Sequence, residues 1–234
     1  SHVSSVGQPV GQFFGFILDG VYTQKEIEDP TVAKFPGAVA GNPKYRDIDG
    51  DGIITELLDF TVIGNPHPKF VFGFSNTFGY RNWDVMVNIK GRYGGKVMNG
   101  MRQTTDNLQG YFNIGKEWVN RWINAENPGD GIHAGRPELV HRVNDKLWIE
   151  DGSYLRITNV TLGYNLSKDV TSRIGLQNGA RLYITSQNLL TVTKYSGPNP
   201  EGQAQGINNT LAPNYDLNSY PIARIVSVGL NINF

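Results

Sequence analysis

KFVFGFSNTFGYRNWDVMVNIKGRYGG, residues 69–95, carries the strongest structural signal in the chain. Residues 70–80 and 83–93 each alternate between apolar side chains and small or polar ones, which is the pattern of a β-strand with two unlike faces. Arg81-Asn82 separates the two runs, so we expect a hairpin with a tight turn. Each run spans ten residue steps. At about 3.3 Å per residue and a tilt of about 40°, a strand of this length covers roughly 25 Å of height, as tall as the apolar band of a transmembrane β-barrel.

Aromatic side chains mark both ends of the two predicted strands. They are Phe70, Tyr80, Trp83 and Tyr93. Transmembrane barrels carry aromatic girdles at both membrane interfaces, so this placement predicts that the four rings face lipid. The opposite faces carry small, polar or charged groups, which suits a water-filled lumen. A β-sandwich is the alternative, because the same alternation can face a second sheet, although sandwich strands are usually only about five or six residues long.

Weaker alternation predicts four further strands. They lie at residues 13–22, 154–166, 181–191 and 222–234, with one short helical turn expected at residues 168–174. The connections at residues 23–68, 96–153 and 192–221 are long enough to be functional or locally folded. Six strands cannot close a membrane barrel, since single-chain barrels start at about eight. The sequence therefore predicts an all-β, antiparallel transmembrane β-barrel segment of about six strands with long extracellular loops.

The composition excludes several classes of protein. Basic and acidic side chains are equal in number, 21 each, so the chain lacks the basic excess of a general nucleic-acid binder. It has no cysteine, which removes disulfide scaffolds, thiolate zinc sites and thiol nucleophiles. The four histidines show no H-x-x-x-H spacing, and no local catalytic constellation accompanies them. We therefore predict no catalytic residues and no enzymatic activity.

The two ends of the chain also carry information. The first residues show neither an initiator Met nor a signal peptide, so we interpret the chain as a mature product or a piece of a longer one. Alternation continues to the last residue, Phe234, without the polar tail with which most chains end. This ending is similar to the final strand of a bacterial outer-membrane barrel, where a terminal Phe acts as an assembly signal.

An acidic stretch, DIDGDGI at residues 47–53, matches the opening of an EF-hand calcium loop. The expected ligands are Asp47, Asp49, Asp51, the carbonyl of Ile53, and Asp59. The twelfth position of the loop is Leu58, so the nearest carboxylate, Asp59, comes one place late, and no flanking helices are evident. The sequence predicts a calcium-stabilised loop rather than an EF-hand sensor, with a solvated Asp-Gly turn as the alternative.

Six ordered motifs resemble one protein family. They are GFILDGVY (15–22), YRDIDGDG (45–52), IGNPHP (63–68), SYLRITNVTLGY (153–164), NLL (188–190) and the terminal Phe234. Together they resemble the C-terminal quarter of the SusC/RagA-like TonB-linked outer-membrane transporters of Bacteroidota. The acidic residue displaced to Asp59 departs from the family pattern.

The resemblance implies a 22-stranded barrel that is filled by an N-terminal plug, energised through TonB and capped by a SusD-like surface lipoprotein. Residues 1–234 would be the C-terminal part of that barrel, with the plug and the TonB-contacting segment absent from this chain. The implied partners are the remaining N-terminal barrel and plug, the SusD-like lipoprotein, TonB through the absent part, and outer-membrane lipid.

The implied function is uptake of glycans or peptides across the bacterial outer membrane, and the sequence assigns no substrate-binding residue. The alternative function is a soluble β-sandwich module that binds carbohydrate through loop aromatics and carries a calcium-stabilised loop.

Overall fold

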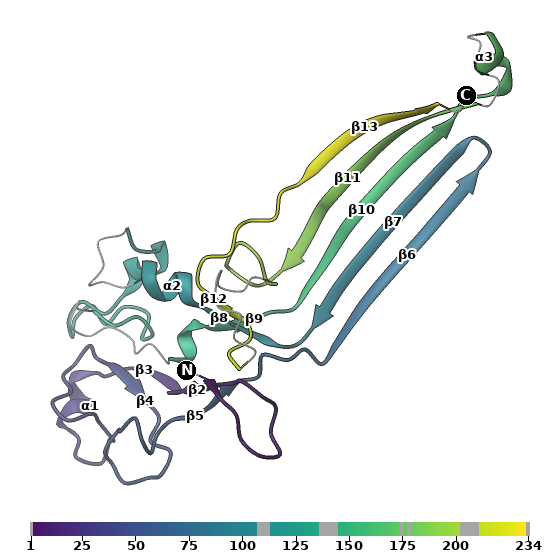
Figure 1. The fold of residues 1–234 in the computed structure, drawn as a ribbon. Helices are drawn as coiled ribbons and strands as arrows, with labels where there is room; N and C mark the ends of the chain where they lie inside the picture. Colours follow the sequence, from purple (N-terminus) through teal and green to yellow (C-terminus); the bar gives the residue numbers. More distant parts are fainter. Residues whose placement is uncertain are drawn as a thin grey trace. The chain divides into compact units, whose positions relative to one another are not determined.

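The computed structural model describes residues 2–106, 113–135, 145–173, 176, 179–201 and 211–232. The chain divides into two compact units (Figure 1). The strand unit comprises Pro68–Gly94, Gly152–Pro200 and Tyr220–Phe234. The loop unit comprises Ser1–His67, Gly95–Asp151 and Glu201–Ser219.

The strand unit is built on one antiparallel sheet of five strands. In chain order these are β6 (Phe70–Tyr80), β7 (Trp83–Tyr93), β10 (Tyr154–Asn165), β11 (Ala180–Thr193) and β13 (Ile225–Ile232). Across the sheet they lie in the order β13-β11-β10-β7-β6, so each long strand pairs with the next long strand along the chain. This meander is the arrangement of an up-and-down barrel wall, and it confirms the predicted all-β, antiparallel class.

The predicted hairpin is confirmed. β6 and β7 pair without a bulge, from Phe70 opposite Tyr93 to Tyr80 opposite Trp83. Arg81 adopts a positive φ of 53°, which a two-residue hairpin turn requires and which few residues other than Gly and Asn adopt readily. Its guanidinium lies over the Tyr80 ring, 5.3 Å from the ring centroid.

An extra residue in β10 changes which side chains share a face. Ile157 pairs with Ile89 and Asn159 pairs with Asn88, so Thr158 has no partner in β7 and forms a bulge. The Thr158 hydroxyl donates to the Asn88 carbonyl at 3.1 Å. Because of the bulge, the alternation of β10 shifts by one residue at this point.

The strand predicted at residues 13–22 is wrong. The segment forms two short strands of the loop unit, β2 (Gln12–Gly15) and β3 (Leu18–Val21), which belong to different sheets. Phe13, Phe16 and Tyr22 are fully buried, so the apolar side chains of this segment face a protein core. The described sheet of the strand unit therefore contains five long strands rather than six.

Short elements hold the loop unit together. Its other strands are β1 (His2–Val3), β4 (Pro43–Tyr45), β5 (Thr61–Gly64), β8 (Lys96–Asn99), β9 (Ile149–Asp151) and β12 (Tyr215–Asp216). Its helices within the described residues are α1 (Gln24–Glu28), α2 (Gly100–Thr105) and the 3₁₀ turns η1 (Lys116–Asn120) and η3 (Lys146–Trp148). One core surrounds Phe13 and Met98, and another surrounds Phe16 and Tyr45.

The helical turn expected at residues 168–174 is present as α3 (Lys168–Arg173), in the connection between β10 and β11. Among the described residues, none of the helices has both the length and the apolar character needed to span a membrane.

Candidate functional site: an exposed apolar sheet face and an acidic loop

One face of the five-stranded sheet is apolar and exposed; we call it the apolar face. All four predicted girdle rings lie on it, with exposed fractions of 54% for Phe70, 70% for Tyr80, 49% for Trp83 and 54% for Tyr93. Exposed aliphatic side chains of the other strands continue the same face, among them Leu162, Leu182, Ile184, Val228 and Leu230. Among the described residues of the strand unit, no second sheet covers these rings, so the β-sandwich alternative is not favoured. A contiguous exposed apolar surface of this kind marks an interaction site or a lipid contact.

The rings pair across strands at both ends of the hairpin. Phe70 stacks on Tyr93 with centroids 5.5 Å apart, and Trp83 meets Tyr164 with centroids 4.6 Å apart. Tyr164 was not among the predicted girdle residues. In the sequence, Tyr164 lies near the end of the alternating run 154–166, which is where the other rings lie in their own strands. The structure adds the strand register, which places Tyr164 opposite Trp83.

The opposite face, which we call the polar face, carries hydrogen-bonded polar side chains. The Thr161 and Thr185 hydroxyls lie 2.8 Å apart across β10 and β11, and the Ser75 hydroxyl donates to Asn88 Oδ1 at 2.5 Å across β6 and β7. These polar groups lie on the face that the sequence predicts to line a lumen.

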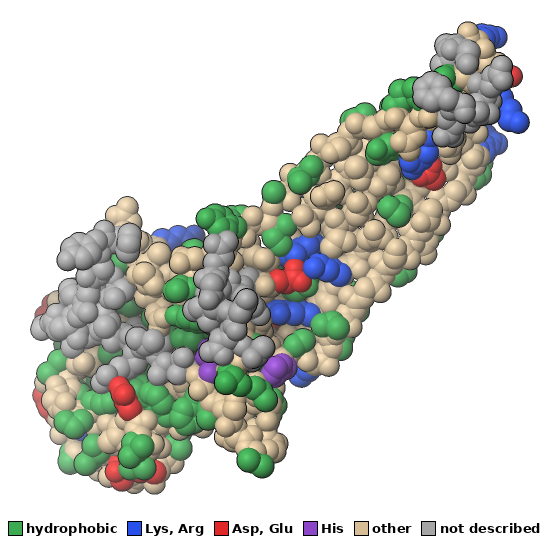
Figure 2. All heavy atoms as spheres, in the orientation of Figure 1, with side chains coloured by type: hydrophobic (Ala, Val, Ile, Leu, Met, Phe, Trp, Pro, Cys, Tyr) green, Lys and Arg blue, Asp and Glu red, His purple; other side chains and the backbone are tan. Residues whose placement is uncertain are grey.

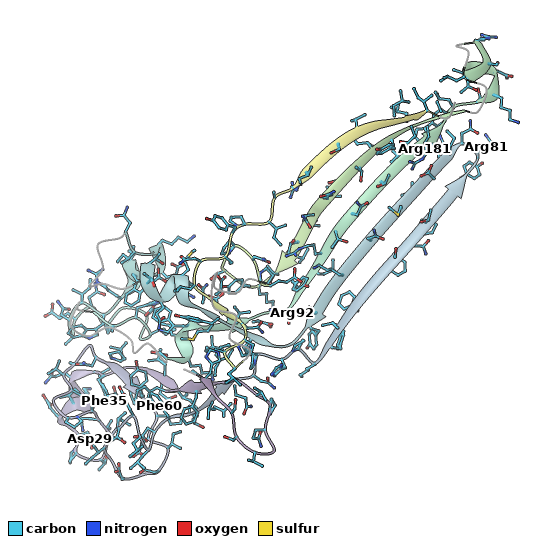
Figure 3. The ribbon with its side chains drawn as sticks, viewed as in Figure 1. Asp29, Phe35, Phe60, Arg81, Arg92 and Arg181 are labelled. Atoms are coloured by element: carbon cyan, nitrogen blue, oxygen red, sulfur yellow. The ribbon has the colours of Figure 1, made fainter. Side chains whose placement is uncertain are left out.

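An ion pair crosses the polar face from β7 to β11, over β10. The Arg181 guanidinium donates to both carboxylate oxygens of Asp84, at 3.0 and 2.5 Å. Gly163 lies beneath this pair, and a Cβ at that position would come within 2.5 Å of Asp84 Oδ1. The absence of a side chain at Gly163 therefore leaves the space that the ion pair occupies. Arg181 is labelled on the sheet in Figure 3.

Charge is divided unequally between the two units. The strand unit contains ten Lys and Arg residues but only two carboxylates, Asp84 and Asp169, whereas the loop unit contains eleven basic and nineteen acidic residues. The formal net charge of zero therefore conceals a charge of +8 on the strand unit and −8 on the loop unit. The net charge of the whole chain does not reveal this division, because the residues of each unit come from separate parts of the sequence.

The acidic loop brings three of the five predicted metal ligands together. Asp47, Asp49 and Asp59 each place one carboxylate oxygen within 4.8 Å of the other two. Ligand oxygens 2.3–2.6 Å from one Ca²⁺ can lie up to about 5 Å apart, so this separation is compatible with a single ion. Asp51 is not part of the cluster, and its carboxylate accepts the Ile53 N–H at 2.8 Å.

Backbone donors hold two of these carboxylates in place. Asp59 is 0% exposed, and its two oxygens accept the N–H groups of Ile48 and Thr55, each at 2.7 Å. Asp47 accepts the N–H groups of Gly50 and Gly52, at 2.6 and 2.9 Å. The predicted carbonyl ligand, Ile53, pairs with Lys34 in an isolated parallel bridge.

Asp47 and Asp49 differ in how readily they ionise. The Gly52 N–H, followed by other donors of the loop, lowers the pKa of Asp47. Loss of water contact, together with the Asp51 charge, raises the pKa of Asp49. A cation at this point would stabilise the ionised form of Asp49, which the loop by itself disfavours.

The predicted assembly signal, Phe234, lies outside the described residues. The described part of the last strand, β13, ends at Ile232 and pairs along its whole length with β11, from Ile225 opposite Gln187 to Ile232 opposite Ala180.

No protein-family model matches the chain. TonB-dependent receptor P3 of Formosa agariphila is 33% identical over 232 residues, which cover 97% of this chain and 22% of that protein. TonB-dependent receptor P26 of the same organism is 34% identical over 232 residues, covering 98% and 23%. TonB-dependent receptor SusC of Bacteroides thetaiotaomicron is 25% identical over 225 residues, covering 94% and 20%. The chain thus spans about a fifth of the length of these relatives.

Solved structures share the fold. The RagAB peptide transporter superposes with a TM-score of 0.73 at 23% identity, covering 98% of this chain and 23% of that chain. The RagAB peptide importer in the "open-open" state gives a TM-score of 0.71 at 23% identity, covering 100% and 23%. Similarity to named receptors along almost the whole chain thus agrees with the ordered sequence motifs and with the exposed apolar sheet. The chain belongs to the SusC/RagA-like family of TonB-dependent receptors, which are proteins of the bacterial outer membrane.

Proposed function

We propose that this chain forms the C-terminal part of the barrel wall of an outer-membrane importer that takes up glycans or peptides. The observation that carries the proposal is the five-stranded sheet with one exposed apolar face and one hydrogen-bonded polar face. In the outer membrane, the apolar face would contact lipid, with Phe70, Tyr80, Trp83 and Tyr93 at the two interfaces. The polar face would line the water-filled interior. The relatives are named as receptors, and the structural neighbours as a peptide importer, which supports transport rather than catalysis.

The remaining parts of the machine lie outside this chain. The plug, the other strands of a 22-stranded barrel and the segment that contacts TonB would come from the rest of the protein. Phe234 would act as the signal that the barrel assembly machinery recognises. A SusD-like lipoprotein would cap the extracellular side, where the long connections of the loop unit would meet it.

Uptake by intact cells tests this function. Cells that carry or lack the receptor are given labelled peptide and oligosaccharide mixtures, with and without a protonophore. We expect receptor-dependent uptake of one substrate class, abolished by the protonophore because TonB draws its energy from the proton gradient. Uptake that is the same in both strains for both mixtures would contradict the proposal. Co-purification of a surface lipoprotein with the tagged receptor tests the partner.

The acidic loop would bind one calcium ion through Asp47, Asp49 and Asp59. The support is the short distance among their carboxylate oxygens and the preference of Ca²⁺ for hard oxygen ligands. Calorimetric titration of the receptor after removal of metal with a chelator should give one equivalent of calcium per molecule. The control is Asp51→Asn, because Asp51 lies outside the cluster and an amide oxygen can still accept the Ile53 N–H. This variant should bind calcium normally.

A second variant separates the folded geometry from the sequence spacing. Exchanging two neighbours, Leu58→Asp with Asp59→Leu, creates the acidic twelfth position of an EF-hand. We nevertheless expect this variant to lose calcium, because Leu58 is 49% exposed whereas the Asp59 carboxylate is buried against two backbone donors. Wild-type affinity in the exchanged variant, or no calcium in the wild-type receptor, would show that these three carboxylates are not the ligands.

A further inference from the structure

A groove of about 300 Å³ lies on the apolar face of the strand unit. Its walls are almost wholly apolar and come from β7, β10, β11 and β13. The principal lining side chains are Trp83, Leu162, Tyr164, Leu182, Ile184 and Val228. A groove of this chemistry suits a hydrocarbon chain.

The strand register locates the groove at one end of the sheet. Trp83, Tyr164 and Leu182 lie opposite one another in the first row of side chains after the turn between β6 and β7. Leu162 and Ile184 lie in the next row of the same face, two residues further along their strands. Two residues cover about 7 Å of strand, so the whole groove lies close to this end. The turn between β6 and β7 and the helix α3 are both at the same end (Figure 1).

Three exposed cations surround this end of the sheet. Arg81 occupies the turn between β6 and β7, and Lys168 and Arg173 are the first and last residues of α3. Within the described ranges, none of the three makes an ion pair, and the nearby carboxylate of Asp169 makes none either. The space-filling view shows Lys and Arg side chains at this tip of the strand unit (Figure 2). These charges are therefore available to an external anion.

We propose that the groove and these three cations together bind one phospholipid with an anionic headgroup. Its acyl chain would lie between the Trp83–Tyr164 pair and Val228, and its phosphate and headgroup would lie among Arg81, Lys168 and Arg173. The four cations at this end, Arg81, Lys168, Arg173 and Arg181, outnumber the two carboxylates there, Asp84 and Asp169, and the resulting local charge of +2 favours an anionic lipid over a zwitterionic one. The inference rests on the proposed membrane wall, because it requires the apolar face to meet lipid.

Quenching of Trp83 fluorescence by brominated lipids tests the site on the whole detergent-purified receptor. The probes are phosphatidylglycerol and phosphatidylcholine carrying bromine on the same acyl carbons, and Trp83→Phe identifies the part of the quenching that belongs to Trp83. We expect half-maximal quenching of Trp83 at a lower concentration of brominated phosphatidylglycerol. Each neutralised cation should weaken binding of the anionic lipid about fivefold, so the triple variant Arg81→Gln/Lys168→Gln/Arg173→Gln should lose roughly 100-fold.

A matched control neutralises cations that lie farther along the strands from the groove. Lys194 follows the end of β11 and Arg224 precedes the start of β13, and both are exposed. Lys194→Gln/Arg224→Gln should keep the full preference for phosphatidylglycerol. The charge-conserving variant Arg81→Lys/Lys168→Arg/Arg173→Lys should keep it as well. Heat-modifiable gel migration of every variant establishes that the barrel is folded before lipid is added.

The outcomes distinguish this inference from the proposed function. Equal quenching by the two lipids, or equal losses in the triple variant and in the control, would overturn the phospholipid site and leave the membrane wall intact. Absence of Trp83 quenching by either lipid would overturn both, because the apolar face would then not meet lipid.

Discussion

Replacing Val87 with Arg should strongly impair assembly of the barrel wall. Val87 lies on the apolar face, opposite Asn76 of β6 and Val160 of β10. It is four residues from Trp83 and six from Tyr93, the two ends of β7. These separations correspond to about 13 and 20 Å along the strand and, at a tilt of about 40°, to roughly 10 and 15 Å of depth. Val87 is therefore near the middle of the proposed membrane band.

The expected cost follows from that depth. An Arg that faces lipid near the bilayer midplane costs about 2–4 kcal/mol, falling to about 0–1 kcal/mol near the interfaces. The folding equilibrium in vesicles should therefore shift by about 30- to 700-fold for Val87→Arg. The measurement is the folded fraction of the receptor in lipid vesicles against urea, read from heat-modifiable migration on gels.

Two controls identify the cause of the loss. Asn88→Arg changes the next residue, which faces the polar side, and should cost only about 1 kcal/mol through its lost hydrogen bond with Ser75. Val192→Arg changes the apolar face near the far end of β11 and should cost about 0–1 kcal/mol. Equal losses for Val87→Arg and Asn88→Arg would refute the assignment of the two faces. Equal losses for Val87→Arg and Val192→Arg would refute the dependence on membrane depth.

Two further predictions concern local interactions. Gly163→Val should displace the Asp84–Arg181 ion pair and destabilise the receptor by about 1–3 kcal/mol in the same urea titration. Gly73→Val changes a glycine on the same face that has open space around it, and it should cost much less. Similar losses of stability in the two variants would argue against a role for the ion pair. The hydrogen bond from Lys44, and after it the capping hydrogen bond from the Thr23 N–H, lower the pKa of Glu26 below its value in an unfolded chain. The ionised Glu26 therefore stabilises the fold at pH values above the usual pKa of Glu. This stabilisation is lost as the pH falls through the lowered pKa. The hydrogen-exchange protection of residues 24–28 should fall over that pH interval, and Glu26→Gln should remove the pH dependence; an unchanged profile in the variant would exclude Glu26 as its source.

Alternation in the sequence predicted the hairpin of residues 70–93 because its register is unbroken. Every residue of β6 has one partner in β7, so the two faces read from the sequence are the two faces of the sheet. In β10 the bulge at Thr158 shifts the alternation by one residue, and the sequence pattern is clear only after that point. A bulge depends on pairing with the neighbouring strand, which the sequence of a single strand does not reveal.

The error at residues 13–22 has a different physical cause. Alternation reports that one side of a segment avoids water, and a protein core satisfies that requirement as well as lipid does. Phe13 and Phe16 are buried in two separate cores of the loop unit, and the strands β2 and β3 belong to different sheets. Strand length carries the distinguishing information, because the four-residue strands β2 and β3 are too short to cross a membrane, whereas β6 and β7 have eleven residues each.

The acidic loop shows why spacing along the chain is an incomplete guide to a metal site. Counting from Asp47 places Leu58 at the twelfth position and so argues against a complete EF-hand loop. In the fold, the Asp59 N–H donates to the Thr55 carbonyl at 3.1 Å and closes one helical turn. This turn rotates Asp59 toward Asp47 and Asp49 and leaves Leu58 exposed. The helical turn thus brings the thirteenth residue, Asp59, close to the first and third residues, Asp47 and Asp49. The displaced acid is therefore no argument against calcium once the local backbone is known.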